Sequence, residues 1–102
     1  MKRRVEWSLA ALDDLKAQVA WIARDNPAAA RQVAARIRSA GDGLADFATG
    51  HPGRVAGTYE KSVGGSPYII VYAIDRTDAA EVVVVLHVIH TARDWRAGAW
   101  PV

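Results

Sequence analysis

The spacing of the apolar residues changes once along this chain, near residues 49–53, and this change constrains the possible folds more than any other feature. Before that point, apolar side chains recur every three or four residues, which is the period of an amphipathic helix. After it, they form short alternating or continuous runs separated by turn residues, which is typical of strands. The sequence therefore predicts a helical half followed by a sheet.

A first helix is predicted from about residue 9 to residue 24. Its apolar stripe consists of Leu12, Leu15, Val19 and Ile22. Ser8 stands immediately before this helix, where a serine hydroxyl can accept a hydrogen bond from a free N–H of the first turn. Residues 3–7 alternate between polar and apolar side chains, so we expect a short strand to lead into the helix.

A second helix is predicted to begin directly after the first, because Asn26 can cap it and Pro27 suits its first position, where no N–H is needed. Its apolar stripe consists of Ala30, Val33, Ala34 and Ile37. Leu44 and Phe47 extend the same spacing, so we expect the helix to continue, bent or frayed, to about residue 48. Since the link between the helices is so short, they should form an antiparallel hairpin over about residues 9–48.

The second half of the chain predicts a meander of short strands. We expect them at residues 54–56, 58–63, 68–74 and 82–90. The last three are joined by links of hairpin length that are rich in turn residues, which favours antiparallel pairing. The last two are apolar on both faces, so helices should cover one face and something else the other. The expected class is α+β, with an N-terminal strand and an antiparallel helical hairpin packed on a twisted, mainly antiparallel sheet.

Composition limits the function classes. A chain of 102 residues that is 51% hydrophobic and 24% charged fits a single globular domain over residues 1–102, with a polar tail at 91–102. The absence of cysteine excludes disulfides, a cysteine metal site and a thiol nucleophile, and it suits the cytoplasm. No apolar run approaches the length of a membrane span, so we expect a cytoplasmic protein without a membrane. A net charge of +2 does not favour a nucleic acid over an acidic protein as partner.

Few side chains are placed for chemistry. The glycines do not form a phosphate-binding loop, and His87 and His90, three apart on one strand, should point to opposite faces, so neither a metal nor a cofactor is predicted. We interpret His87 as a structural histidine that is hydrogen-bonded or at an edge, and we keep His90, at the end of its strand, as a candidate. Tyr68 and Tyr72 share the parity of apolar neighbours, which favours core packing with each hydroxyl at the rim.

A cationic and imidazole set remains, formed by Arg54, Lys61, His90 and Arg93. Such a set could cleave RNA without a metal if His90 transferred protons while the cations stabilised charge on the phosphorane. It could equally hold a protein partner. Glu60 neighbours Lys61 on a strand and faces the other way, so we interpret it as part of a solvated cross-strand pair rather than as a catalytic base.

Six segments of the chain, taken in order, carry a family resemblance. They read Val5-Glu6-Trp7-Ser8, Asp25-Asn26-Pro27-Ala28-Ala29-Ala30, Gly53-Arg54, Gly57-Thr58-Tyr59-Glu60, Pro67-Tyr68-Ile69-Ile70-Val71-Tyr72 and Val88-Ile89-His90-Thr91-Ala92-Arg93-Asp94-Trp95. Together they resemble the RelE/ParE superfamily of toxins from bacterial type II toxin–antitoxin systems. The segments at 67–72 and 90–95 look most like the ParE branch.

The resemblance implies a small toxin held inactive by a cognate antitoxin, ParD-like or another small protein, in a toxin–antitoxin hetero-oligomer. The antitoxin would lie in the groove between the helical hairpin and the sheet. ParE-like members inhibit DNA gyrase and are not known as nucleases. Under that interpretation the candidates for target contact are Arg54, Glu60, His90, Arg93 and Trp95.

Two alternatives stay open. RelE-like members cut mRNA on the ribosome, and here such an endoribonuclease would use Arg54, Lys61, His90 and Arg93. Residues 49–62 carry only two of these cations, where RelE-like nucleases concentrate several, so the sequence favours the gyrase inhibitor. The other alternative is an inactive relative that only binds its antitoxin.

Overall fold

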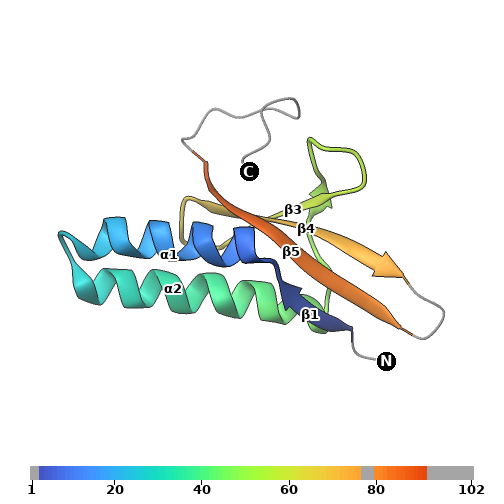
Figure 1. Cartoon of the computed structure of the whole chain (residues 1–102), viewed down its shortest axis with the longest axis horizontal. Coiled ribbons are helices and arrows are strands. Elements are labelled where there is room, and N and C mark those ends of the chain that lie inside the picture. The colour runs from blue at the N-terminus through green and yellow to red at the C-terminus, as the bar shows by residue number, and fades with distance from the viewer. Residues whose placement is uncertain (1–2, 77–79, 92–102) are drawn as a thin grey trace.

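The computed structural model describes residues 3–76 and 80–91, and these form two helices on one side of a five-stranded sheet (Figure 1). Along the chain the elements are β1 (Arg4–Trp7), α1 (Leu9–Ala23), α2 (Pro27–Asp42), the 3-10 turn η1 (Gly43–Ala45), β2 (His51–Pro52), β3 (Tyr59–Ser62), β4 (Tyr68–Arg76) and β5 (Glu81–His90). The α+β class with an N-terminal strand and a helical hairpin is confirmed. None of the helices in the described ranges is long and apolar enough to cross a membrane.

The sheet is mainly antiparallel, as predicted. Its strand order is β1-β5-β4-β3-β2, and the four strands from β2 to β5 form an antiparallel meander. β1 pairs with β5 in the parallel direction, with Arg4 opposite Val82. The first and last strands of the described chain therefore lie side by side (Figure 1). β1 is the edge strand of the sheet, and α1 follows directly after it.

β5 contains a β-bulge near its middle. Tyr72 pairs with Val85, whereas Val71 pairs with His87, so β5 holds one extra residue at this point. The bulge shifts the alternation of side chains between the two faces. As a result Val85 and Val88, three residues apart, both lie in the core beneath the helices.

Both helices begin where the sequence predicts, because each start has a local cap. The Ser8 hydroxyl accepts a hydrogen bond from the Ala11 N–H at 3.0 Å, and the Asn26 side-chain oxygen accepts one from the Ala29 N–H at 3.1 Å. Pro27 occupies the first position of α2. These bonds satisfy backbone donors that have no partner within a helix.

The predicted end of the second helix is wrong. α2 stops at Asp42 and η1 at Ala45, and the Phe47 side chain is 75% exposed instead of extending the buried stripe. Gly41 lowers the helix propensity of this turn, and it is buried directly against the ring of Trp7 on β1. The helix thus ends where it meets the first strand, and that contact has no signal in the local sequence.

The strand predicted at residues 54–56 is also wrong. The strand there is β2, His51–Pro52, which pairs with the start of β3. Residues 54–57 form a bend and turn, closed by hydrogen bonds from the Gly53 N–H to the Thr58 carbonyl and from the Thr58 N–H to the Val55 carbonyl. Because β2 ends at Pro52 and β3 begins at Tyr59, the chain must reverse direction within a compact loop.

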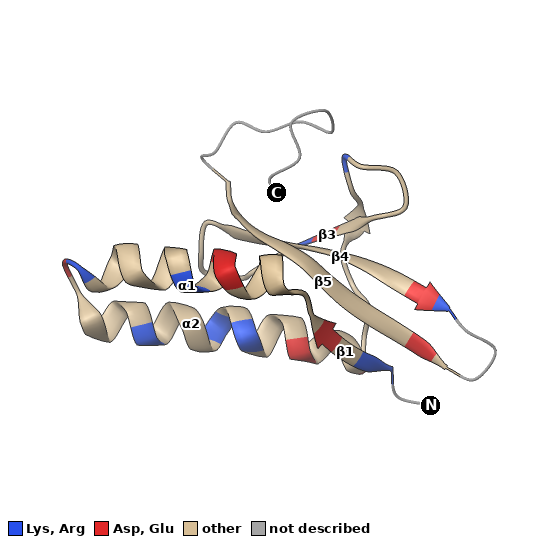
Figure 2. Cartoon of the chain, in the orientation of Figure 1, with Lys and Arg blue, Asp and Glu red and all other residues tan. Residues whose placement is uncertain are grey.

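The core lies between the helices and the sheet, and a smaller apolar cluster lies on the opposite face. The main core consists of Ala11, Leu15, Ile37, Leu44, Val63, Tyr68, Ile70, Tyr72, Val83, Val85 and Val88. On the other face Val71 and Ile89 are buried, with Val55 and Ile69 packed against them. The prediction that β4 and β5 are apolar on both faces is therefore confirmed. The charged positions of α2 are mainly arginines, Arg31, Arg36 and Arg38, which recur along the helix (Figure 2).

Candidate functional site

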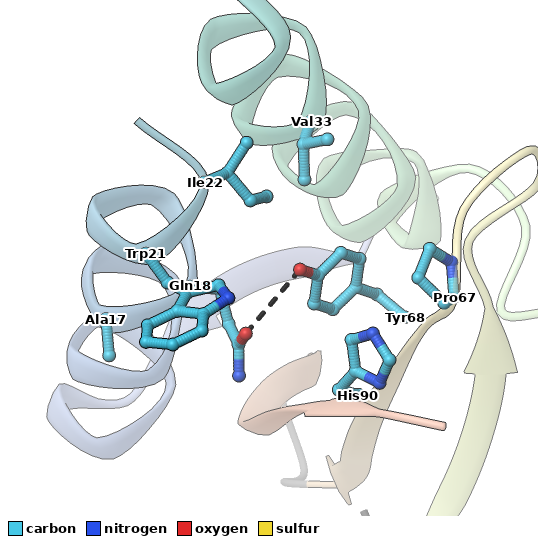
Figure 3. A pocket seen from close by; sticks show the side chains of 8 residues that line it. All are labelled: Ala17, Gln18, Trp21, Ile22, Val33, Pro67, Tyr68 and His90. Carbon is cyan, nitrogen blue, oxygen red and sulfur yellow. Dashed lines mark hydrogen bonds between the residues drawn. The ribbon is translucent and has the colours of Figure 1, made fainter. Parts of the chain in front are cut away.

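A pocket of about 790 Å³ opens between the helical hairpin and the sheet, where β4 begins and β5 ends (Figure 3). Its lining comes from both helices and both strand ends, namely Ala17, Gln18, Trp21, Ile22, Val33, Pro67, Tyr68 and His90. The residues of α1 are spaced so that they share one flank of the helix. The pocket therefore lies in the groove where the sequence leads us to expect a protein partner.

Trp21 forms an exposed apolar wall of this pocket. Its side chain is 68% exposed, and the guanidinium of Arg24 lies 5.1 Å from the centre of its ring. An exposed tryptophan beside a concave apolar surface is typical of a binding site, because a ligand can bury it. Arg24 adds a positive charge at the outer edge of the same wall.

Tyr68 and His90 lie across the pocket from Trp21, and Gln18, on the same helix as Trp21, reaches Tyr68 (Figure 3). The Tyr68 hydroxyl donates to the side-chain oxygen of Gln18 at 3.5 Å, and the rings of Tyr68 and His90 meet edge to face with centres 5.2 Å apart. Burial raises the pKa of Tyr68 above its ordinary value, so the phenol stays neutral at physiological pH. The prediction that Tyr68 packs in the core with its hydroxyl at the rim is confirmed, since the ring is buried and the hydroxyl reaches the pocket.

His87 is a buried, hydrogen-bonded residue, as the sequence predicts. Its Nδ1 donates to the Asp14 carboxylate at 2.9 Å, and the same oxygen accepts the Val88 N–H at 3.0 Å. Asp14 thus serves as the acceptor for a backbone group at the bulge in β5. The bulge lies before His87, and the pairing from His87 to His90 is regular, so the two histidines alternate between the faces as expected. His87 is opposite Val71 of the smaller cluster, although its ring also reaches Asp14 of α1, whereas His90 is opposite Tyr68 of the main core and lines the pocket.

Glu60 is buried, which corrects its interpretation as part of a solvated pair. Its side chain is 3% exposed, and its Oε2 accepts a hydrogen bond from the Arg54 N–H at 2.9 Å and lies 3.6 Å from Nε of the same arginine. Glu60 is opposite Val71, so this contact lies on the face of the sheet away from the helices. The carboxylate holds the loop at residues 53–58 against β3.

Lys61 lies on the other face. It is opposite Ile70 of the main core, and its Nζ donates to the Thr49 hydroxyl at 2.5 Å. The Tyr72 hydroxyl donates to the carbonyl of Thr49 at 2.7 Å, which confirms the placement of that hydroxyl at the core's rim. Burial and the nearby Tyr59 raise the pKa of Tyr72.

The predicted cationic and imidazole set is therefore divided by the sheet. Arg54 lies with Glu60 on one face, whereas Lys61 and His90 lie on the helical face, on strands separated by β4. Arg93 and Trp95 lie outside the described residues. Within residues 3–76 and 80–91, no group of three or more His, Asp or Glu side chains could hold a metal ion.

Sequence reasoning missed Asp14, Gln18, Trp21 and Arg36 as residues of interest. The spacing of Asp14, Gln18 and Trp21 places them on one flank of α1, which is a detectable pattern. Which strand faces that flank depends on contacts across some fifty to seventy residues of chain, and the sequence offers no signal for them.

Comparisons with known proteins agree with this geometry. The family described as ParE toxin of type II toxin–antitoxin system, parDE, matches residues 5–95. Y4kP of Sinorhizobium fredii, which is named as a toxin, is 41% identical over 95 residues, covering 92% of this chain and 94% of that protein. A structure of the chromosomal ParDE toxin–antitoxin system from P. aeruginosa matches with a TM-score of 0.78 and 17% identity, over 87% of this chain and 96% of that one. At that identity the structural match bears on the fold alone.

Proposed function

This chain belongs to the ParE toxin family of type II toxin–antitoxin systems, and from that premise we propose that it inhibits DNA gyrase through protein contacts and is neutralised by a small antitoxin. The observation that carries the proposal is the family match over residues 5–95, which is to the ParE branch of the superfamily. Under this proposal the chain is a binding protein rather than an enzyme.

The placement of the cations supports the gyrase inhibitor over the mRNA endoribonuclease. Metal-independent cleavage of RNA needs charge-stabilising cations and a proton-transfer group around the same phosphate. Arg54 is held by Glu60 on one face of the sheet, while Lys61 and His90 lie on the other. A phosphate that contacts His90 is thus on the wrong side of the sheet from Arg54.

The pocket beside Trp21 supports an antitoxin site in the same place. A partner segment that enters it would bury the exposed indole together with the apolar surfaces of Ile22, Val33 and Pro67. Burial of apolar surface is the main driving force of such association. The groove between hairpin and sheet is therefore proposed as the antitoxin-binding site.

Induced expression in a bacterial host tests the target. We expect induction of the DNA-damage response, and we expect the purified chain to alter supercoiling or cleavage by gyrase while cellular mRNA stays intact. Rapid loss of protein synthesis with mRNA cut in ribosomes would contradict the proposal and favour the endoribonuclease. Normal growth with folded protein present would favour the inactive relative.

Co-expression tests neutralisation. The probe is the product of a short reading frame adjacent to the gene for this chain. We expect it to form a stable complex with the chain and to restore growth. A product that binds but leaves growth arrested, or does not bind, would contradict neutralisation by that protein.

A further inference from the structure

Arg36 spans the groove between α2 and the turn that joins β3 to β4. Its Nη1 donates to the carbonyl of Gly65 at 2.9 Å. Gly65 has a positive φ of 73°, and a Cβ at this residue would lie 2.7 Å from Nη1. The close approach of the guanidinium therefore depends on the absence of a side chain in the turn.

The Arg36 bridge has a cavity on each side. The pocket of about 790 Å³ includes Val33 and Pro67, and a second cavity of about 410 Å³ includes Ala40 and Val63. Val33 precedes Arg36 by three residues and Ala40 follows it by four, so all three side chains lie on one flank of α2. The two cavities therefore lie in line along α2, and a partner segment laid along this helix would meet both of them.

The bridge can be exchanged for a stronger contact. A guanidinium has five N–H donors in a planar fork, and the Gly65 carbonyl uses one of them. A carboxylate accepts two parallel hydrogen bonds from the same fork and carries the opposite charge, so it outcompetes a neutral carbonyl. Arg36 is exposed, which leaves the fork accessible to a partner.

The length of the groove limits the partner's geometry. Val33 and Ala40 are seven residues apart, which is about 10 Å along a helix. Residues i and i+7 of a partner helix span the same distance on one face, and residues i+3 and i+4 lie between them. In a strand, the two residues about 10 Å apart are i and i+3, and their side chains point to opposite faces. A strand could therefore not place both of these side chains in the two cavities.

Building on the proposed function, we infer that the antitoxin segment in this groove is an amphipathic helix with apolar residues at i and i+7 and an Asp or Glu at i+3 or i+4. The apolar residues enter the two cavities, and the carboxylate takes Arg36 from the carbonyl of Gly65. One partner segment then occupies both cavities, and Arg36 becomes the residue that selects an acidic partner.

A charge-reversal pair tests this inference. Arg36→Glu is compared with Arg31→Glu, which makes the same charge change at an exposed site of α2 that lines neither cavity. Binding of the adjacent-frame product to each full-length chain is measured by calorimetry at two salt concentrations, after thermal unfolding shows that the variants are folded. We expect Arg36→Glu to weaken binding about 10-fold or more and Arg31→Glu by less than about 3-fold. Equal effects, or none at Arg36, would overturn the inference.

Rescue from the partner's side makes the test sharper. Each acidic residue of the antitoxin is changed to Lys, and each variant is titrated into Arg36→Glu. We expect one position, flanked by apolar residues at the stated spacing, to restore binding, and restoration at no position would contradict the inference. Arg36→Gln, which is less disruptive to folding, should lose affinity without being rescued. If the wild-type chain is bound and neutralised while these results fail, the inference falls and the proposed function stands.

Discussion

At the scale of single residues, Gly41 shows how the absence of a side chain sets the junction between a helix and a strand. It is buried against the ring of Trp7, whose Nε1 also donates to the Asp42 carboxylate at 3.1 Å. The guanidinium of Arg38 lies 5.0 Å from the centre of the same ring. The indole is thus held on several sides and has little room to move away from an added methyl group.

We therefore expect Gly41→Ala to lower the free energy of unfolding by about 1–3 kcal/mol, the usual cost of overpacking. Helix propensity alone would act in the opposite direction by about 1 kcal/mol. Gly43→Ala is the matched control, because a Cβ there meets nothing within 4 Å. It should be neutral or slightly stabilising in urea unfolding, and equal losses in the two variants would contradict the role of Trp7.

Asp14 is a second residue whose contacts lie far away in sequence. Asp14→Ala removes the acceptor shared by the His87 ring and the Val88 N–H, so we expect a loss of about 1–3 kcal/mol. Asp14→Asn keeps an acceptor oxygen and should cost less. The exposed neighbour Asp13 is the control, and Asp13→Ala should stay within about 0.5 kcal/mol. Urea unfolding measures all three, and a cost for Asp13→Ala equal to that of Asp14→Ala would contradict this role.

The two buried tyrosines predict a dependence of stability on alkaline pH. Burial raises the pKa values of Tyr68 and Tyr72 in the folded chain above the value of about 10 expected when unfolded. The unfolded chain loses these protons first, so the associated stability is complete below about pH 10 and is lost as the pH rises through the folded pKa values. Urea midpoints measured from pH 8 to 11 should fall only at the alkaline end. A Tyr68→Phe variant should show a shallower fall, and an unchanged slope would contradict the assignment.

At the scale of secondary-structure elements, the beginnings of both helices and the end of α1 followed from the sequence, and the end of α2 did not. Ser8 and Asn26 cap their helices through bonds to residues three positions on, so the signal is entirely local. The end of α2 depends instead on the packing of Trp7, 34 residues before Gly41. Local signals were thus sufficient only where the stabilising contact was itself local.

The same distinction explains the errors in the sheet and the site. The strand expected at 54–56 is a loop because its residues bond to Thr58 and Glu60. The bulge in β5 is supported by Asp14, 74 residues before Val88, so a regular alternation was the only pattern that the sequence offered. The predicted grouping of Arg54 with His90 failed because the Glu60 carboxylate holds Arg54 on the face of the sheet away from the helices, whereas the groove itself follows from two amphipathic helices packed on a sheet.

The caps permit a prediction for the two helices. Asn26→Ala should lower the free energy of unfolding by about 1 kcal/mol, the usual cost of losing an N-cap. Ser8→Ala should cost more, because the Ser8 hydroxyl also donates to the Leu86 carbonyl at 3.1 Å and so ties α1 to the bulge. Thermal unfolding of the two variants measures the difference, and equal costs would contradict the contribution of that second bond.

At the scale of the whole molecule, the pocket predicts that a substitution can weaken antitoxin binding without changing the free energy of unfolding. Trp21 and Leu9 are both exposed residues of α1, but only Trp21 lines the pocket. Trp21→Ala should weaken antitoxin binding by about 2 kcal/mol, as expected for a central aromatic contact, and change stability by less than about 0.5 kcal/mol. Leu9→Ala should change neither quantity much. Calorimetric titration and urea unfolding check the pair, and equal affinities would contradict the proposed binding site.

The position of β5 has a consequence for the order of events during synthesis. β5 is the last strand of the described chain to leave the ribosome, yet it lies between β1, the first strand, and β4. The hairpin of α1 and α2 is therefore synthesised well before β5. Both the sheet and the pocket, which includes His90, are incomplete until β5 has been made. A nascent chain that stops before residue 81 lacks β5, so we expect the proposed antitoxin site to form only after residues 81–90 have been synthesised.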